Sequence, residues 1–368
     1  MAVQAMAPRK IELKGTPREI GLQHGRLLQS EIKSQMEVYG AMFELTSQMA
    51  WPEVLDVAAE FAATIKRLTP EIFDEMQGIA EGAQVQLLDI VALNCRSEIA
   101  LGRFTDGCTS IAWNVGNVQS KKVVLAQNWD WTAQVKKNIV MMSIEQVGTP
   151  KIWMITESGI VGKIGFNSAS VGTCLNAIRA RPILSTKVPI HVALRLCLQS
   201  TSVDGAIATL RTLGGVASSQ HILLADKTRA VGLELSPLGD VHLSEQDGIV
   251  THSNHFIENR YVEEPPWLAG SPVRLERIRQ LAAKLKSEGV GGDMVEGSLL
   301  RERIFSDTFN APQAICCIED ASRPIQTRSS TLFNVVMSLK EGEGGSSAEV
   351  VWGKPGSGEE GPTLVMPW

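Results

Sequence analysis

The sequence lacks the features from which a membrane protein or a disulfide-bonded scaffold is built. No run of about 18 consecutive apolar residues occurs, so we expect no transmembrane helix and no membrane partner. Residues 1–10 contain no apolar segment of the kind found in a signal peptide. The six cysteines are scattered and form no C-x-x-C pair, which argues against a zinc ribbon, a thioredoxin motif or a disulfide framework. We therefore expect reduced thiols in a cytoplasmic protein.

An excess of basic charge is also missing, as are several common catalytic motifs. Lys and Arg number 35 against 40 Asp and Glu, a net charge of −5. Proteins that bind nucleic acids are normally basic, so we expect no nucleic-acid partner. There is no G-x-S-x-G nucleophile elbow, no Walker loop and no H-E-x-x-H helix. His252 and His255 are three residues apart, but no third ligand is evident, so we expect no metal and no other cofactor.

Helical patterns dominate the first hundred residues of the 368-residue chain. Thr16 can cap a helix, Pro17 suits the first helical position, and Glu19 can reach back to the cap. Apolar residues then follow helical spacing from Ile20 to Tyr39. Three further helices are expected at residues 52–68, 70–82 and 87–94.

After Cys108 the pattern changes to strands, which are short segments rich in Val, Ile, Trp and Met. Strands and helices come in blocks rather than in strict alternation. This favours an α+β fold in which helices cover antiparallel or mixed sheets. Strands are expected at 109–115, 123–128, 139–145, 152–156, 221–225, 230–235, 241–243, 249–251, 314–318, 331–339 and 349–352. Helices are expected at 189–199, at 203–213 and after Ser271-Pro272.

Gly107 and Cys108 lie at the border between the helical and the strand blocks. Gly107 tolerates backbone conformations closed to other residues. A thiol at Cys108 could attack the carbonyl of Gly107, so that the amide becomes a thioester that water then cuts. The freed α-amino group of Cys108, with a pKa of about 7.7–8.0, could then accept the thiol proton. Taken alone, the dipeptide fits a small buried structural cysteine as well.

A series of short motifs extends the pattern over nearly the whole chain. They are GTPREIG at 15–21, LNCRSE at 93–98, DGCT at 106–109, QNWDW at 127–131, ITESGI at 155–160, GFNSA at 165–169, HSNH at 252–255 and TLFN at 331–334. In order and spacing the chain resembles the isopenicillin N acyltransferase family, the acyl-coenzyme A:6-aminopenicillanate acyltransferases of the N-terminal nucleophile hydrolase superfamily.

The resemblance implies a four-layer αββα sandwich of the N-terminal nucleophile hydrolase type with a helical N-terminal region. Members of the family are made as an inactive precursor, cleave themselves before the cysteine and remain together as an α/β heterodimer. We therefore expect cleavage between Gly107 and Cys108. The expected products are a mainly helical chain of residues 1–107 and a chain of residues 108–368 that begins with the nucleophile, in one integrated catalytic domain.

The resemblance also implies roles for single residues. Cys108 matches the nucleophile, Asp130 matches an aspartate that holds the nucleophile region or the substrate, and Asn254 matches the donor to the oxyanion. Arg328 matches an arginine near the site that could bind a carboxylate. Three of these residues also have an ordinary alternative. Asp130 could cap a turn at a strand end, Asn254 could simply lie in a turn, and Arg328 could be a solvated loop arginine. Cys317 stands where a basic residue is expected, which leaves the preferred substrate charge open.

The function implied is acyl transfer from an acyl-CoA or an amide to a β-lactam or other amine through a Cys108 thioester. An amidohydrolase of small N-acyl amides, such as β-alanyl amides, is the alternative on the same site. A second alternative is an uncleaved, non-enzymatic homologue. The residues Met366-Pro367-Trp368 do not match a peroxisomal signal, which again favours a cytoplasmic location.

Overall fold

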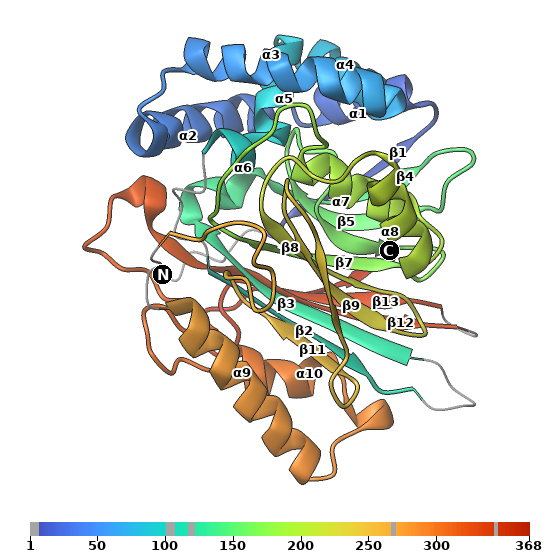
Figure 1. Cartoon of the computed structure of the whole chain (residues 1–368), viewed down its shortest axis with the longest axis vertical. Helices are drawn as coiled ribbons and strands as arrows, with labels where there is room; N and C mark the ends of the chain where they lie inside the picture. Colours follow the sequence, from blue (N-terminus) through green and yellow to red (C-terminus); the bar gives the residue numbers. More distant parts are fainter. Residues whose placement is uncertain (1–6, 101–106, 117–121, 266–269, 342–344) are drawn as a thin grey trace.

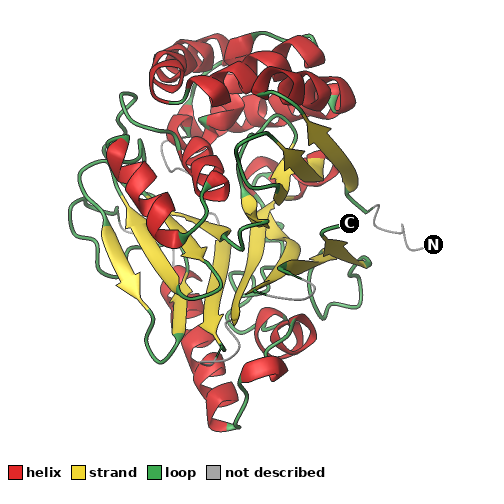
Figure 2. Ribbon diagram, turned by 90° about the vertical axis from the view of Figure 1, so that its right-hand side faces the viewer, coloured by secondary structure: helices red, strands yellow, loops and turns green. Residues whose placement is uncertain are grey.

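Two β-sheets lie face to face between helices in the computed structural model, which describes residues 7–100, 107–116, 122–265, 270–341 and 345–368. One sheet has eight strands and the other six. Helices cover the outer side of each sheet, so the layers run helix, sheet, sheet, helix (Figures 1 and 2). This arrangement confirms the expected α+β class and the four-layer αββα sandwich.

The N-terminal helices form a layer of their own at the top of Figure 1. Thr16 and Glu19 cap α1 reciprocally, as the sequence predicts. The single helix expected from Ile20 to Tyr39 is wrong, because the chain leaves helical geometry at the buried Leu28 and starts a second helix. The helices are α1 Pro17–Leu27, α2 Gln29–Ser47, α3 Trp51–Leu68, α4 Pro70–Ala83, α5 Leu87–Asn94 and α6 Arg96–Ile99.

Four glycines let α1 and α4 pack with their backbones almost in contact. A Cβ atom on Gly21 would lie 2.0 Å from the carbonyl oxygen of Glu75, and one on Gly25 would lie 2.2 Å from that of Ile79. Gly78 and Gly82 meet the backbone of α1 in the same way. No side chain larger than hydrogen fits at these positions, so the glycines determine how closely the two helices approach.

The eight-stranded sheet packs against α7 (Ile190–Gln199), with α8 (Val203–Thr212) beside it (Figure 1). Its first strand pairs in parallel with its neighbour, and the other neighbours are antiparallel. In order, the strands are β1 Arg9–Lys14, β4 Ile139–Glu145, β5 Ile152–Glu157, β6 Ile164–Asn167, β7 Gly172–Ala177, β8 Gln220–Ala225, β9 Ala230–Leu235 and β10 Val241–Ser244. The sequence pattern did not predict β1, β6 or β7.

The six-stranded sheet is covered by α9 (Gly270–Ser287) and α10 (Gly297–Leu300). Its neighbouring strands are all antiparallel. In order they are β11 Ile249–His252, β2 Gly107–Asn114, β3 Lys122–Thr132, β12 Ser329–Lys340, β13 Ser347–Trp352 and β14 Thr363–Met366. Short 3₁₀ or π segments occur at Ala133–Asn138, Gly292–Met294, Arg301–Phe305 and Ile325–Thr327. Among the helices of the described ranges, none has both the length and the apolar composition needed to cross a membrane.

The strand expected at 314–318 is wrong. Residues 314–317 are buried and Ile318 is exposed, and the backbone pairs with isolated partners: the N–H of Cys316 donates to the carbonyl of Asp307, and that of Ile318 to Pro312. The carbonyl of Ile315 accepts from the Asn128 side chain. A short buried apolar run has the same sequence pattern whether or not it pairs as a strand, which explains the error.

Strand β2, which begins with Gly107 and Cys108, has two faces that meet different layers. Ser110 and Ala112 face the other sheet, where the Ser110 hydroxyl donates to Asn176 on β7. Ile111 and Trp113 face α9 and α10. Side chains alternate along a strand, so Cys108 points between the two sheets, on the face of Ser110.

Candidate active site

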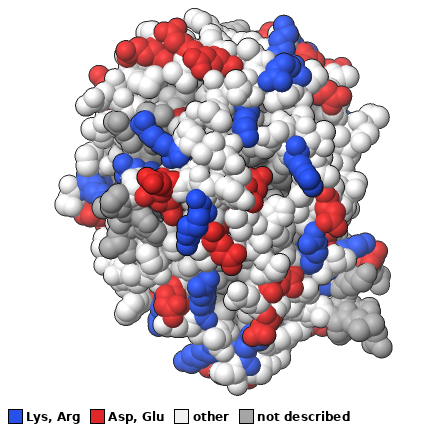
Figure 3. Space-filling model, in the orientation of Figure 1, with Lys and Arg blue, Asp and Glu red and all other residues white. Residues whose placement is uncertain are grey.

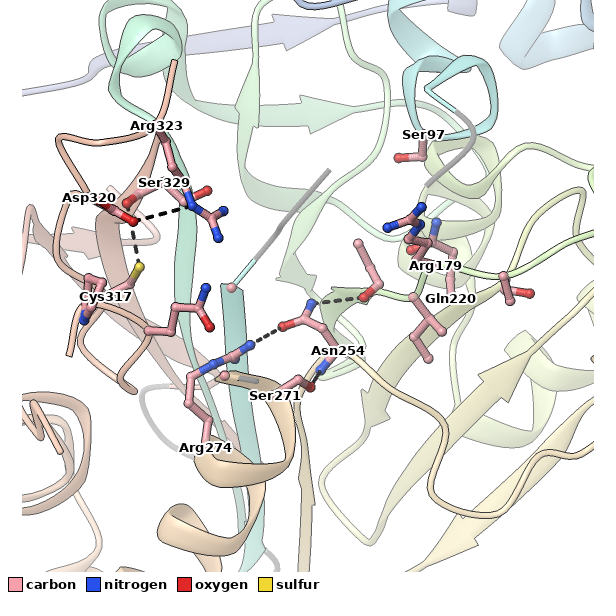
Figure 4. Close-up of a pocket in the computed structure, with 18 of the residues that line it drawn as sticks. Ser97, Arg179, Gln220, Asn254, Ser271, Arg274, Cys317, Asp320, Arg323 and Ser329 are labelled. Atoms are coloured by element: carbon pink, nitrogen blue, oxygen red, sulfur yellow. Dashed lines mark hydrogen bonds and ion pairs between the residues drawn. The ribbon is translucent and has the colours of Figure 1, made fainter. Parts of the chain in front are cut away.

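A pocket of about 1130 Å³, including the space open to solvent, lies beside the first residue of β2. Gly107 lines it, together with segments from both sheets and the start of α9 (Figure 4). Its walls carry apolar side chains, such as Ile178 and Ile183, and polar ones, such as Gln220 and Gln313. Asp106, the first residue of the DGCT motif at the expected cleavage point, lies outside the described residues.

Both backbone groups of Cys108 are held by side chains from other elements. Its N–H donates to Asn254 Oδ1 at 2.8 Å. Its carbonyl accepts from Arg274 at 2.7 Å and from Asn176 Nδ2 at 3.0 Å. The residue is only 3% exposed. Thus the backbone of Cys108 lies at the pocket, next to Gly107, while its thiol points into the protein.

The orientation of the Asn254 amide follows from its partners. Its oxygen accepts from Arg274 at 2.9 Å as well as from Cys108. Its nitrogen donates to the carbonyl of Ala177 at 2.9 Å, and the Ser271 hydroxyl accepts its backbone N–H at 2.7 Å. Arginine only donates and a carbonyl only accepts, so the amide cannot be turned over without losing both bonds. In the unbroken chain, Asn254 therefore presents its oxygen to Cys108, not the N–H that an oxyanion needs.

Asp130 lies on β3 directly opposite Gly107. Its carboxylate is fully buried and accepts a 2.6 Å hydrogen bond from Thr331 on β12. A Cβ atom on Gly107 would lie 2.8 Å from Asp130 Oδ2, closer than such atoms can approach. The residue before Cys108 must therefore be glycine if Asp130 is to keep this position. Asp130 is inside a strand, so it does not cap a turn.

Arg328 is not among the residues that line the pocket. Its guanidinium donates to the backbone carbonyls of Ala321 at 3.0 Å and Arg323 at 2.9 Å. It thereby holds the loop from which Asp320 and Arg323 reach the pocket. The structure places Arg328 behind the wall rather than in it, and its predicted contact with a substrate carboxylate stays a prediction.

The arginines that do line the pocket are Arg179, Arg274 and Arg323. Figure 4 shows Arg179 and Arg323 on opposite walls. Arg323 lies 3.6 Å from Asp320, whereas the exposed Arg179 guanidinium makes no hydrogen bond or ion pair within the described part of the chain. Cys317 also lines the pocket, and burial raises the pKa of its thiol well above the ordinary value. On the face of the molecule in Figure 3, acidic and basic side chains are interspersed.

A buried charged cluster lies on the inner side of Cys108, between the sheets. Glu157, at the end of β5, accepts from Arg96 at 3.1 Å and contacts the ammonium of Lys163. The Tyr39 hydroxyl also donates to it, as does Gln35 at 2.7 Å. Burial raises the pKa of Glu157, but Arg96 and Lys163 outweigh burial and bring that pKa down to about 2. The carboxylate is therefore ionised throughout the physiological range.

The histidines near the site serve hydrogen bonding. His252 contacts Glu234 at 3.0 Å through Nε2 and the carbonyl of Ser253 at 2.8 Å through Nδ1. His221 stacks on His252 at 3.5 Å and contacts the Asn176 side chain at 3.0 Å. This stack supports the asparagine that holds the Cys108 carbonyl. In the described ranges, no group of three or more His, Cys, Asp or Glu residues could hold a metal ion.

Sequence reasoning missed Arg274, Asn176 and Lys163. Arg274 follows the Ser271-Pro272 helix start, and Lys163 lies between two of the recognised motifs. Asn176 ends a strand that the pattern did not predict. Each reaches Cys108 only through the fold, because 166 residues separate Arg274 from Cys108 and 68 separate Asn176 from it.

Comparison with known proteins identifies the family of the chain. Residues 117–346 match the family described as acyl-coenzyme A:6-aminopenicillanic acid acyl-transferase. The chain is 32% identical to the acyl-coenzyme A:6-aminopenicillanic-acid-acyltransferase 40 kDa form of Emericella nidulans, over 97% of this chain and 95% of that protein.

Two solved structures resemble it more distantly, each with 14% sequence identity. The Caenorhabditis elegans N-acylethanolamine-hydrolyzing acid amidase ortholog matches with a TM-score of 0.44, over 62% of this chain and 92% of that one. Penicillin V acylase from Agrobacterium tumefaciens matches with a TM-score of 0.39, over 67% of this chain and 83% of that one. By its sequence matches, the chain belongs to the acyl-coenzyme A:6-aminopenicillanic acid acyltransferase family.

Proposed function

We propose that this chain is a self-processing cysteine acyltransferase that cleaves itself between Gly107 and Cys108. One observation carries the proposal: the backbone nitrogen of Cys108 lies 2.8 Å from Asn254 Oδ1, beside a pocket lined by Gly107. Cleavage would turn that nitrogen into an α-amine already held at the pocket. The products, residues 1–107 and 108–368, would remain together as a heterodimer because β1, from the first chain, pairs with β4, from the second, at the edge of the eight-stranded sheet.

The proposed cleavage step breaks the peptide bond between Gly107 and Cys108. The Cys108 sulfur adds to the carbonyl carbon of Gly107, the C–N bond breaks, and the nitrogen takes a proton to become an amine. Water then hydrolyses the thioester, which leaves a carboxylate on Gly107 and a free thiol on Cys108. Asp130 supports this step by holding Gly107 from the opposite strand, where only a glycine fits.

In turnover the same thiol would take the acyl group from the donor as a thioester. The new α-amine, with a pKa of about 7.7–8.0, accepts the thiol proton and returns it to the leaving group. Asn254 Oδ1 would hold one N–H of this amine so that its lone pair faces the sulfur. Asn254 would keep its orientation after cleavage, because Arg274 and the carbonyl of Ala177 still hold it. One hydrogen of its Nδ2 is donated to Ala177, and the other would donate to the oxyanion, the predicted role. Arg274 supports this arrangement, because it contacts Asn254 and Cys108 together.

The substrates proposed are an acyl-CoA donor and an amine acceptor of the 6-aminopenicillanate type, which the Emericella relative's name specifies for that protein. The pocket supports an anionic substrate, since three arginines and one aspartate line it. Arg328 would act on the substrate through the loop that it holds. The alternative, hydrolysis of small N-acyl amides, uses the same thioester, and the solvent-open, partly polar pocket would admit water. The acceptor that reaches the thioester first decides between the two reactions.

Intact-mass analysis of the denatured protein tests the self-processing. We expect two species that correspond to residues 1–107 and 108–368, while the Cys108→Ala variant stays a single chain. A single wild-type species that no incubation converts would reject the proposal. With cleaved protein, an acyl-CoA is then supplied with and without 6-aminopenicillanic acid. N-acyl product with little free acid indicates a transferase, and free acid at an unchanged rate indicates a hydrolase.

A further inference from the structure

We propose that Lys163 is the electrostatic partner of the Cys108 thiolate, and that the chain depends on it before cleavage. The inference rests on the proposed function, since it takes Cys108 as the nucleophile. It assigns a role to a residue that does not line the pocket and that lies on the side of β2 facing the other sheet. Lys163 immediately precedes β6 in the eight-stranded sheet, and β2 belongs to the six-stranded sheet that faces it (Figure 1).

Strand register brings Lys163 to the side-chain face of Cys108. Cys108 on β2 pairs directly with Trp129 on β3, so their side chains lie on the same face of the sheet. The Lys163 ammonium lies 3.6 Å from the centre of the Trp129 ring. Its side chain is only 1% exposed, so water screens it little. The cation is thus held in the layer into which the thiol points.

Lys163 shares the carboxylate of Glu157 with a second cation, Arg96. Glu157 contacts both Lys163 and Arg96, and Arg96 opposes the charge on Lys163. Two of the neighbouring groups favour the charged form of Lys163: Glu157 and the thiol of Cys108. A buried ammonium is costly unless it is paired, so a thiolate at Cys108 would supply a second anionic partner.

The other titratable groups around Lys163 do not replace Cys108 in this role. His191, on α7, stays neutral because burial, and then Arg96 and Lys163, hold its pKa well below the ordinary value. Tyr39 donates its hydroxyl to Glu157, and burial raises its pKa well above the ordinary value. Burial lowers the pKa of Lys163 to about 8 although Glu157 opposes it, so the lysine is still mostly charged at neutral pH.

Coupling between two ionisable groups is reciprocal. If the Cys108 thiolate favours the ammonium of Lys163, the ammonium favours the thiolate by the same amount. This matters most in the unbroken chain, where the Cys108 nitrogen is an amide whose N–H is donated to Asn254. Such a nitrogen has no free lone pair and cannot accept the thiol proton.

Before cleavage, the thiol therefore gives its proton to solvent water or hydroxide, and Lys163 stabilises the anion that remains. The thiolate forms the C–S bond to Gly107 as the C–N bond breaks, and the nitrogen of Cys108 takes its proton from water. Hydrolysis by a second water restores the thiol. Lys163 keeps its own proton throughout, so its charge rather than its basicity is what the step requires.

The test follows cleavage of freshly translated full-length chain as a function of pH, with Lys163→Met and Lys163→Arg beside the wild type. Loss of the charge in Lys163→Met should raise the pH of half-maximal rate by about one unit and slow cleavage at neutral pH about tenfold. Lys163→Arg should keep the wild-type profile. The proposal would be overturned if folded Lys163→Met had the same dependence of cleavage rate on pH as the wild type. It would also be overturned if the profile of Lys163→Arg were shifted as far as that of Lys163→Met.

Arg195→Met is the control, because Arg195 is also a fully buried cation paired with a buried carboxylate, but it lies on α7 and contacts Glu75 of α4 at 2.7 Å. It should lose stability without a shift in the profile. If Lys163→Met does not fold, the wild type decides: a midpoint at or above about 8.5, the ordinary value for cysteine, refutes the stabilised thiolate.

A wild type that never splits rejects self-processing itself, which is a different failure. In that case iodoacetamide labelling of Cys108, located by peptide mass, gives the same comparison of pH profiles in the uncleaved chain. An equal profile in wild type and Lys163→Met then overturns the role of Lys163 independently of cleavage.

Discussion

Replacing Arg274 by methionine should disable the site while leaving the fold in place. Arg274 is 3% exposed, and its guanidinium donates to three acceptors: the Cys108 carbonyl at 2.7 Å, the Thr109 hydroxyl at 3.0 Å and Asn254 Oδ1 at 2.9 Å. Methionine has a similar stem and fills much of the same space. It makes none of these hydrogen bonds, so both Cys108 and Asn254 lose a fixed donor.

The size of the effect follows from these contacts. A hydrogen bond to a charged group contributes about 1.5–3 kcal/mol, and a barrier increase of about 1.4 kcal/mol slows a reaction tenfold. If the transition state depends on one of the bonds to Cys108 or Asn254, the rate should fall about 10- to 100-fold. Dependence on both would produce a larger loss. Arg274→Lys, which can reach one acceptor but not all three, should lie between the wild type and Arg274→Met.

The measurements are the rate of chain cleavage, the turnover of the cleaved enzyme, and urea unfolding as a check of the fold. Arg279→Met is the control, because Arg279 lies on the same helix and, within the part of the chain that the structure describes, donates only to the Thr251 hydroxyl, at 3.4 Å. It should cleave and turn over like the wild type. An Arg274→Met variant that folds and retains most of both rates would refute the assignment of Arg274 to the site.

Three further changes probe the site and its surroundings. Gly107→Ala should block or slow cleavage, because its Cβ would lie 2.8 Å from Asp130 Oδ2. The double variant Gly107→Ala/Asp130→Ser removes that contact, so it should be more stable in urea unfolding than Gly107→Ala alone. Equal stability of the two variants would contradict the clash. Arg179→Gln should raise KM for an anionic donor with little change in kcat, and an unchanged KM would remove Arg179 from substrate binding. His24 is buried and accepts the N–H of Gly159 at 2.9 Å through Nε2, and burial, then Arg195, lowers its pKa to about 3. The folded state thus binds fewer protons than the unfolded state, so stability falls as pH drops from 6.5 toward 3. The contribution of His24 to this loss of stability should reach about 2 kcal/mol by pH 5. Glutamine can still accept the N–H of Gly159, so the free energy of unfolding of His24→Gln in urea should depend less steeply on pH than that of the wild type. An equally steep profile would exclude His24 as a source of the dependence.

Local sequence determined much of the secondary structure and pointed to Cys108 as the proposed nucleophile. The capping box of Thr16 and Glu19 formed as expected, because its partners are three residues apart and need no other part of the chain. Strands such as β4 and β9 were found at their predicted bounds, since short runs rich in apolar residues mark them. Gly107 and Cys108 were recognised through their position between the two blocks and the motifs around them. Family membership likewise follows from sequence, because the matches extend over most of the chain.

Tertiary structure alone decided how these residues meet. The segment at 314–318 has the composition of a strand, but its hydrogen bonds go to single partners in other loops and to the side chain of Asn128. The orientation of the Asn254 amide depends on Arg274 and Ala177, which are distant in sequence. Arg274 reaches Cys108 only because α9 packs on the outer face of β2. Lys163 lies over the Trp129 ring, on the inner face of the sheet that holds β2, because the two sheets stack. Contacts between sheets and helices depend on register and packing over the whole chain, and no local pattern of residues encodes them.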